Sequence, residues 1–193
     1  MTLTDAQIDR YSRQIIVPHI GGRGQERLLN ARLLLVGDAR DIETPLAYLV
    51  GAGVGTIYLS QSGERLISGA HELNSDVMVK VADKLPGDAD LALLIVGSDA
   101  VRQIAIDVAN SRSRQALVLA RLDDPGKIAI TPTKHSHIET SVFAEFGARS
   151  DAADFVAMLA TVEAFKLLAG YDENPAPAII EFDGYATAVR ALS

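Results

Sequence analysis

The chain has 193 residues, of which 48% are hydrophobic and 22% are charged, and 18 basic against 25 acidic residues give a net charge of −7. This composition excludes intrinsic disorder, which requires low hydrophobicity and high net charge, and it predicts one domain with a sizeable core. It also argues against nucleic-acid binding, because a negative surface repels phosphates.

Three further absences narrow the class of protein. No apolar run approaches the roughly 20 residues that span a bilayer, so we expect no membrane association. Residues 1–13 mix acidic and basic side chains without the apolar stretch of a secretory signal, and we therefore expect a cytoplasmic protein. The chain has no cysteine, which excludes disulfides, thiolate zinc sites, iron–sulfur clusters and thioester chemistry.

The first third of the chain predicts two helices followed by a strand–helix–strand unit. Thr4 and Gln7 have capping-box spacing for a first helix that Pro18 ends. Thr44 and Pro45 have the sequence of a helix start, and the apolar run before them is typical of a strand covered on both faces. After the first helix we expect a glycine turn at 21–24, a helix at 25–30, a strand at 33–36, a helix at 44–50 and a strand at 56–59.

The rest of the chain predicts further strands and helices and a closing hairpin. Ser98 and Ser150 are candidate helix N-caps. The helix after Ser150 has an apolar stripe at helical spacing, formed by Phe155, Met158, Leu159, Val162, Phe165 and Leu168. We expect a helix at 77–85, a strand at 91–96, a helix from 98, strands at 116–120 and 127–131 joined by a turn at 123–126, a helix at 150–170, and hairpin strands at 178–182 and 186–192. Residues 131–149 have too little periodicity for an assignment.

This order of elements predicts the fold class. Strands that alternate with helices indicate an α/β fold with a Rossmann-like, mainly parallel sheet. We expect helices on both faces of the sheet and antiparallel strands at its C-terminal end. No repeat or linker divides the chain, so residues 1–193 should form a single domain with an N-terminal helical arm at residues 4–30.

Four motifs occur together in an unusual combination. They are, in order, Arg10-Tyr11-Ser12-Arg13-Gln14-Ile15-Ile16, Gly24-Gln25-Glu26-Arg27-Leu28, Ala52-Gly53-Val54-Gly55-Thr56-Ile57 and Val162-Glu163-Ala164-Phe165-Lys166-Leu167-Leu168-Ala169-Gly170-Tyr171. Together they resemble one family, ThiF/MoeB/HesA, the bacterial relatives of ubiquitin-activating enzymes. The resemblance covers nearly the whole chain and implies a ThiF-type domain that binds ATP on a Rossmann-like sheet. It also implies adenylation of the C-terminal glycine of a ubiquitin-like or sulfur-carrier protein, and a dimer.

The phosphate-binding loop that the resemblance implies is changed. Such a loop reads Gly-x-Gly-x-x-Gly, because side chains there block the approach of phosphate to the backbone. Here only the first glycine remains, in Gly37-Asp38-Ala39-Arg40-Asp41-Ile42. Asp38, Asp41 and Glu43 also bring carboxylates to this position, and one like-charge pair about 4 Å apart costs about 4 kcal/mol at an effective dielectric of about 20. We expect no bound cofactor, and at most weak binding of ATP and Mg²⁺.

Other family positions are changed as well. The Asp-x-Asp pair at the end of the second strand falls on Gln61 and Gly63, and the metal-binding Asp falls on Gly97. The Asn and Arg of the Asn-Leu-x-Arg-Gln segment fall on Gly69 and Glu72. Zinc-binding Cys-x-x-Cys pairs and an acceptor cysteine cannot exist in this chain. We therefore expect no zinc and no other metal site.

Three candidate site residues remain. Gly37 matches the first loop glycine, although turn geometry alone also explains it. Lys80 aligns with the lysine that contacts phosphate in the family, or it is a solvated lysine on a helix face. Arg13 matches the arginine that reaches across the dimer into the partner's nucleotide site, or it forms a local ion pair. Gly37 and Lys80 are thus vestigial cofactor-binding positions, and Arg13 is a candidate trans-acting catalytic residue.

Two weaker sets of residues have simpler explanations. His135 and His137 lie on one face of an extended segment, where Glu139 could complete a metal site, but a surface loop also explains them. Ser12, Ser60 and Ser62 have no recognisable base partner, and they indicate no nucleophile.

Three functions fit these observations. The leading hypothesis is a non-catalytic binding or regulatory subunit, as a homodimer or a heterodimer with an active family member, that contacts a ubiquitin-like or sulfur-carrier protein. The second is an atypical ATP-dependent adenylyltransferase of such a carrier protein. The third is a dinucleotide-binding oxidoreductase, which suffers from the same missing glycines and has Glu64 as its nearest acid after the second strand.

Overall fold

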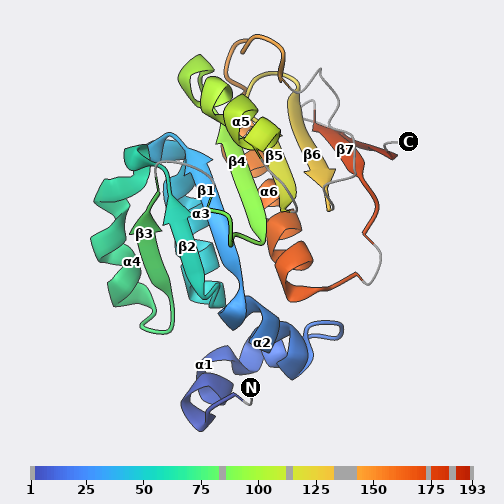
Figure 1. Cartoon of the computed structure of the whole chain (residues 1–193). Coiled ribbons are helices and arrows are strands. Elements are labelled where there is room, and N and C mark those ends of the chain that lie inside the picture. Colours follow the sequence, from blue (N-terminus) through green and yellow to red (C-terminus); the bar gives the residue numbers. More distant parts are fainter. Residues whose placement is uncertain are drawn as a thin grey trace.

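The computed structural model describes residues 3–82, 86–111, 115–132, 143–172, 175–182 and 186–191. Within these residues the centre of the molecule is an eight-stranded sheet of order β3-β2-β1-β4-β5-β6-β7-β8 (Figure 1). The strands from β3 to β5 in this order are parallel, and β6, β7 and β8 continue the sheet antiparallel. The α/β fold class and the antiparallel C-terminal strands predicted from the sequence are confirmed.

The strands follow the apolar runs of the sequence. The central strand β4 is buried at every position, as expected for a strand covered on both faces. The strands are β1 (Arg32–Gly37), β2 (Thr56–Leu59), β3 (Met78–Val81), β4 (Leu91–Val96), β5 (Ala116–Arg121), β6 (Gly126–Thr131), β7 (Ala178–Phe182) and β8 (Thr187–Ala191).

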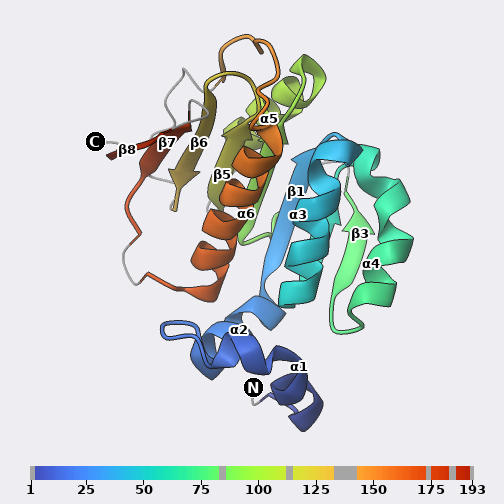
Figure 2. The ribbon, with the colours of Figure 1, turned by 180° about the vertical axis from the view of Figure 1, so that it is seen from behind.

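Helices cover both faces of the sheet, as predicted. Helices α3, α4 and α6 lie on one face (Figure 2), and α5 lies on the other (Figure 1). Strand β1 contributes to both halves of the core, because Leu33 and Leu35 pack toward α3 whereas Leu34 and Val36 pack toward α5. The described helices are α1 (Asp5–Ile15), α2 (Gly21–Asn30), α3 (Ala39–Ala52), the 3₁₀ helix η1 (Gln61–Leu66), α4 (Ile67–Leu73), α5 (Asp99–Ser111) and α6 (Ala153–Ala169). None of them is long and apolar enough to cross a membrane.

The first helix begins as the sequence predicts. The Gln7 amide donates to the Thr4 hydroxyl at 3.3 Å, and the Thr4 amide donates to the Gln7 side chain at 3.1 Å. This reciprocal pair is a capping box. The buried Tyr11 then anchors α1, because its hydroxyl donates to Asp76 at 3.1 Å and accepts from Asn74 at 2.9 Å.

The second helix begins earlier than the sequence predicts. Helix α2 begins at Gly21, so the glycines expected to form a turn lie inside the helix, and the turn comes before them at His19, which has φ 71°. A Cβ at Gly24 would lie 3.3 Å from the Ala169 carbonyl oxygen. This glycine therefore permits close packing of α2 against the end of α6.

The prediction that Thr44 and Pro45 begin a helix is wrong. Helix α3 begins at Ala39, directly after β1, and the Asp38 carbonyl accepts from the amides of Asp41 at 2.8 Å and Ile42 at 3.2 Å. Pro45 therefore lies inside the helix, where it cannot donate to the Asp41 carbonyl. The other end is as expected, with Gly53 in the left-handed conformation at φ 83°.

The prediction of a helix at 77–85 is also wrong. Residues 78–81 form β3, a strand at the edge of the sheet that pairs in parallel with β2, and residues 83–85 lie outside the described residues. The β-branched Val79 and Val81 favour a strand, and Val79 is buried between exposed neighbours. The crossover between β2 and β3 is made instead by η1 and α4, which the sequence analysis did not predict.

Helix α6 has the expected length but presents a different face to the sheet. Its small residues Ala153, Ala157, Ala160 and Ala164 are buried, whereas Phe155 and Val162 of the predicted apolar stripe are 52% and 47% exposed. The small side chains let α6 lie close to the sheet, and Phe155 and Val162 remain on the outer side of the helix. Ser150 accepts from the Ala152 amide at 3.1 Å, and the helix itself begins at Ala153.

The remaining elements agree with the sequence. Ser98 accepts from the Val101 amide at 3.4 Å at the start of α5. Within that helix Val101, Ala105 and Val108 are buried, whereas Ile104 is 43% exposed. Strands β7 and β8 form the closing antiparallel pair, and the turn expected between them at 183–185 lies outside the described residues.

Candidate functional site

The fold itself indicates where a ligand would bind. In an open parallel sheet ligands bind at the carboxyl ends of the strands, where the strand order reverses. Here the order reverses at β1, which has β2 on one side and β4 on the other. Strand β1 ends at Gly37, and Gly97 directly follows β4. We call the place formed by Gly37, Asp41, Gly97 and Arg149 the switch-point site.

The side chain of Asp41 occupies this site. Asp41 lies in the first turn of α3, and its carboxylate is completely buried. A Cβ at Gly97 would clash with the Oδ2 atom of Asp41, so the carboxylate lies directly against the backbone at the end of β4. Asp41 is therefore accommodated only because residue 97 has no side chain.

An arginine from a distant segment neutralises this carboxylate. The Nη2 atom of Arg149 lies 2.8 Å from Asp41 Oδ1 and 3.4 Å from Asp154 Oδ1. Arg40 is a weaker and more exposed partner, with Nε 3.5 Å from the same Asp41 oxygen. The positive end of the α3 dipole adds to the stabilisation of a carboxylate in its first turn. Asp41 and Arg149 thus form an internal ion pair at the switch-point site.

A second ion pair holds the segment that carries Arg149. The buried Arg121 guanidinium donates to both carboxylate oxygens of Asp123 and to the carbonyls of Ala144, at 2.6 Å, and Glu145, at 2.9 Å. Asp123 also accepts from the Gly147 amide at 3.0 Å. These bonds tie residues 144–147 to the end of β5, and so they position Arg149 above the sheet.

Two carboxyl groups around this segment have lowered pKa values. Burial raises the pKa of Asp123, but hydrogen bonds from Arg121 and the Gly147 amide outweigh burial and hold the pKa below its ordinary value. The hydrogen bond from Arg102, followed by that from the Phe146 amide, lowers the pKa of the exposed Asp99. Both groups therefore favour the charged form that their partners need.

The structure does not bring the three predicted site residues together. Gly37 lies at the switch-point site, where a Cβ would clash with Ile42. Lys80 is exposed on the edge strand β3, two strands away from β1, and not on a helix. Arg13 is exposed in the last turn of α1, a helix that lies near the start of β1 (Figure 1). The switch-point site lies at the opposite, carboxyl end of that strand.

The other family positions contribute no carboxylate to the site. Gln61 and Gly63 lie in η1 after β2, and Gly69 and Glu72 lie in α4. Among the described residues no three His, Asp or Glu side chains come together as metal ligands. His135, His137 and Glu139 lie outside the described residues.

Sequence reasoning missed Arg149. It belongs to the stretch 131–149 that has no periodicity, and its partner Asp41 is far away in the chain. One signal could have suggested a pair. Compared with the family pattern, this chain has an additional acid, Asp41, in the loop after the first strand, and it has Gly97 where the family has an acid. Its positive partner could not be identified from spacing.

Comparisons with known proteins agree with this fold. No protein-family model matches the chain. The sulfur carrier protein adenylyltransferase of Thermus thermophilus is 42% identical over 72 residues, which is 37% of this chain and 26% of that protein. The probable adenylyltransferase/sulfurtransferase MoeZ of Mycobacterium tuberculosis is 47% identical over 55 residues, 28% of this chain and 14% of that protein. The matches thus span about a quarter or less of these curated relatives.

Solved structures resemble the chain over nearly its whole length. The crystal structure of Escherichia coli MccB with ATP superposes with a TM-score of 0.73 over 98% of this chain and 72% of that chain, at 15% identity. PaaA superposes with a TM-score of 0.64 over 99% of this chain and 75% of that chain, at 14% identity. At these identities the likeness shows the fold. The chain is thus similar in fold to MccB and PaaA, and similar over part of its sequence to adenylyltransferases of the ThiF/MoeB type.

Proposed function

We propose that this chain is a non-catalytic member of its family, which acts as a binding or regulatory subunit and has lost adenylation. The observation that carries the proposal is the Asp41–Arg149 ion pair at the switch-point site. The first turn of α3 is where a phosphate group would accept hydrogen bonds from backbone amides. In this chain an internal carboxylate is held there instead.

Electrostatics and sterics both oppose a triphosphate at this position. A phosphate oxygen close to the Asp41 carboxylate would face a like charge, and displacing Asp41 would break its ion pair with the partly exposed Arg149. The Asp41 side chain also fills the space over Gly97 that a ligand would need. A chain that had retained ATP binding would keep this position open.

The groups that would assist adenylation are changed as well. Gly97 replaces the family's metal-binding Asp, and Gln61 and Gly63 replace its acidic pair. Removing one group that stabilises the transition state commonly lowers a rate 10²–10³-fold. The loss of several such groups supports a chain without independent activity.

The second candidate is an atypical adenylyltransferase, and the names of the curated relatives favour it. These relatives are named as adenylyltransferases, one of them of a sulfur carrier protein. For this chain to work in that way, Asp41 would have to leave the site when nucleotide binds. A dinucleotide-binding oxidoreductase would need the same position for its pyrophosphate and meets the same obstacle.

The position of Arg13 supports a proposal about the partners of this chain. Helix α1, which carries Arg13 in its last turn, lies near the start of β1, whereas the switch-point site lies at its end (Figure 1), and this supports a role of Arg13 at a nucleotide bound to another protein. A heterodimer with an active family member would give Arg13 this role, because a guanidinium donates two parallel hydrogen bonds to phosphate oxygens. A homodimer would serve binding alone, for example of a ubiquitin-like or sulfur-carrier protein.

ATP–pyrophosphate exchange with the cognate carrier protein tests the proposal. We expect no exchange above background with the chain alone. Mixed with an active family member from the same organism, the wild-type chain should raise that member's rate, and the Arg13→Ala variant should raise it less. Arg65→Ala, which removes an exposed arginine of η1, is the matched control.

Exchange by the chain alone would overturn the non-catalytic proposal in favour of the adenylyltransferase. Association without any effect of Arg13→Ala would remove the trans-acting role only. A chain that neither associates with the family member nor forms a homodimer on a sizing column would contradict the proposed assembly.

A further inference from the structure

A pocket of about 540 Å³ lies on the N-terminal arm, between the turn that joins α1 to α2 and the end of α6. Its described walls are residues 15–24, Arg27 and residues 169–171. We call it the arm pocket. Its volume is within the range of about 300–1,000 Å³ that is common for small-molecule sites.

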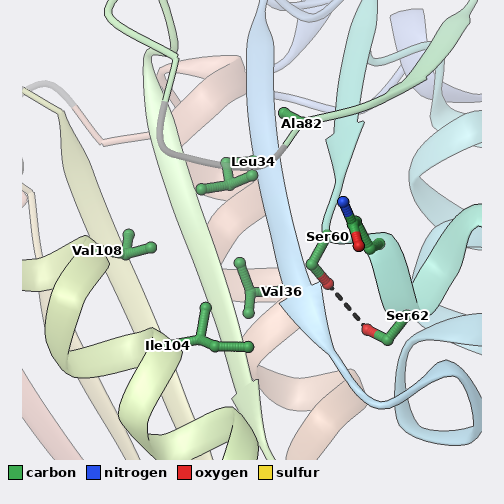
Figure 3. A pocket seen from close by; sticks show the side chains of 8 residues that line it. Leu34, Val36, Ser60, Ser62, Ala82, Ile104 and Val108 are labelled. Atoms are coloured by element: carbon green, nitrogen blue, oxygen red, sulfur yellow. Dashed lines mark hydrogen bonds between the residues drawn. The ribbon is translucent and has the colours of Figure 1, made fainter.

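The arm pocket is remote from the switch-point site. Helix α2 ends at Asn30, just before β1 begins at Arg32, so the arm lies near the amino ends of the parallel strands (Figure 1). Another pocket, beside Ser60 and Ser62, adjoins the switch-point site instead, because the Ser62 hydroxyl donates to the Gly37 carbonyl at 2.7 Å (Figure 3). A ligand in the arm pocket therefore leaves the Asp41–Arg149 pair untouched.

The walls of the arm pocket have the opposite charge to the chain. The chain has a net charge of −7, yet the described walls contain the basic residues His19, Arg23 and Arg27 and no acidic residue. Within the described part of the chain neither arginine forms an ion pair with a carboxylate. A pocket lined by one sign of charge concentrates ligands of the opposite sign, so this one favours an anion.

The two arginines are placed to share one anion. Arg23 and Arg27 are four residues apart in α2, so their Cβ atoms lie about 5–6 Å apart on one face of the helix. Like charges at this spacing repel each other, and a bound anion would remove that repulsion. Arg27 is also held in place, because its Nη1 atom donates to the Gly170 carbonyl at 3.4 Å. Gly170 leaves room for the guanidinium, since a Cβ there would clash with the same Nη1 atom.

A phosphate monoester fits this arrangement better than a carboxylate. It carries a charge of about −1.5 to −2 at neutral pH and three strong acceptor oxygens, so it can bind both guanidinium groups. A carboxylate has one charge and two oxygens, which a single guanidinium satisfies. Beside the arginines the walls carry exposed apolar and aromatic side chains. Ile16 and Val17 are 79% and 38% exposed, and the rings of His19 and Tyr171 are 5.3 Å apart.

We propose that the arm pocket binds a small molecule that carries a phosphate monoester on an apolar or aromatic group. Arg23 and Arg27 share the phosphate, and the apolar group packs on Ile16, Val17 and Tyr171. A polyanion such as nucleic acid is repelled by the net charge of −7, so the ligand is a free small molecule. This inference goes beyond the proposed function and holds whether or not the chain binds ATP.

Three probes separate the phosphate from the apolar group: phenyl phosphate, inorganic phosphate and phenol. Binding is followed by proton–nitrogen correlation NMR, in which the amides of Gly21, Gly22 and Gly24 report on the arm pocket and the amide of Gly97 reports on the switch-point site. We expect phenyl phosphate to shift the first three amides with a dissociation constant of about 1 mM or tighter, and to leave Gly97 unchanged. Inorganic phosphate should bind about tenfold more weakly, because it buries no apolar surface. Phenol should shift none of these amides.

Variants with matched controls locate the site. Arg23→Gln and Arg27→Gln should each weaken phenyl phosphate binding at least about tenfold, because each removes a hydrogen bond to a charged group. Arg65→Gln, at an exposed position of η1, should leave it unchanged. Gly22→Asp adds a carboxylate beside the arginines, where a Cβ would meet nothing within 4 Å, and should abolish binding. Gly69→Asp, at an equally open position of α4, should not. Matching spectra away from the pocket show that each variant is folded.

Four results would overturn the proposal. The first is that phenyl phosphate at millimolar concentration shifts none of the three glycine amides of the arm pocket. The second is a shift confined to Gly97, which would place the anion at the switch-point site. The third is equal affinity of Arg23→Gln, Arg27→Gln and Arg65→Gln for phenyl phosphate. The fourth is tighter binding of a terminally phosphorylated oligonucleotide than of phenyl phosphate, which would make the ligand a nucleic acid.

Discussion

At the scale of single residues, the Asp41–Arg149 pair connects two parts of the chain that are far apart in the sequence. Asp41 belongs to the first turn of α3, and Arg149 belongs to the segment that leads into α6. A loop that binds phosphate is held in place by its ligand, whereas this one is held by an internal partner. We therefore expect the pair to have a structural role as well as the role proposed above.

The structural role of Asp41 can be measured by substitution. Asp41→Asn should lower the free energy of unfolding by about 1–3 kcal/mol, because Arg149 and Arg40 keep their charges but lose the buried carboxylate. Asp154→Asn is the matched control, because its exposed carboxylate contacts the same Arg149 atom at 3.4 Å, and it should cost less than about 1 kcal/mol. Urea unfolding measures both. Equal stability of Asp41→Asn and wild type would show that the pair stabilises nothing.

The Arg121–Asp123 pair predicts a dependence of stability on pH. The pKa of Asp123 is lower in the folded chain than its ordinary value, so the charged carboxylate stabilises the fold. This contribution is complete above about pH 5 and is lost as the pH falls through the folded pKa. Asp123→Asn should therefore cost about 3–5 kcal/mol at pH 7 and progressively less below pH 4.

Urea unfolding at several pH values, from 7 down to 3, tests this prediction. Asp124→Asn is the control, because Asp124 is exposed and adjacent in the chain. A cost of Asp123→Asn that stays constant over this range would contradict the assigned role of the carboxylate.

At the scale of elements, α1 is attached to the sheet domain through Tyr11. A Cβ at Gly53 would lie 2.7 Å from the Tyr11 ring, so two of the family-like motifs meet in the structure through this contact. The Tyr11 hydroxyl also bonds to Asn74 and Asp76, which precede β3. The Arg-Tyr-Ser-Arg motif thus includes a structural anchor beside the candidate trans-acting Arg13.

Removal of the Tyr11 hydroxyl tests this attachment. Tyr11→Phe should destabilise the chain by about 1–3 kcal/mol, because the buried Asn74 amide loses its acceptor. Tyr48→Phe, at an exposed position of α3, should change stability by less than about 0.5 kcal/mol. Hydrogen exchange should show faster opening of α1 in Tyr11→Phe alone. Equal exchange in both variants would mean that other contacts hold the helix.

Elements with strong local signals could be predicted, and those decided by tertiary packing could not. The capping box of Thr4 and the continuous apolar run of β4 gave correct assignments because each signal is local. Residues 78–81 were predicted as part of a helix, and their pairing with β2 makes them a strand. Helix α6 buries a row of alanines together with Val156 and Leu168, while Phe155 and Val162 of the predicted stripe stay exposed. In both cases the deciding partner is distant in the sequence.

At the scale of the whole molecule, the sequence predicted the sheet and one half of the site. The apolar runs and their spacing indicated a Rossmann-like sheet, and the structure confirms it. The acidic residues after β1 include Asp41, and the loss of phosphate binding that they suggest stays a prediction. Arg149 could not be predicted, because no local pattern connects it to Asp41.

The central claim is that an internal ion pair occupies the position of a triphosphate. The most direct test is calorimetric titration of the purified chain with ATP and Mg²⁺. We expect a dissociation constant no tighter than about 1 mM, which corresponds to about −4 kcal/mol. A micromolar constant for the wild-type chain would show that Asp41 gives way to phosphate, and it would contradict the account.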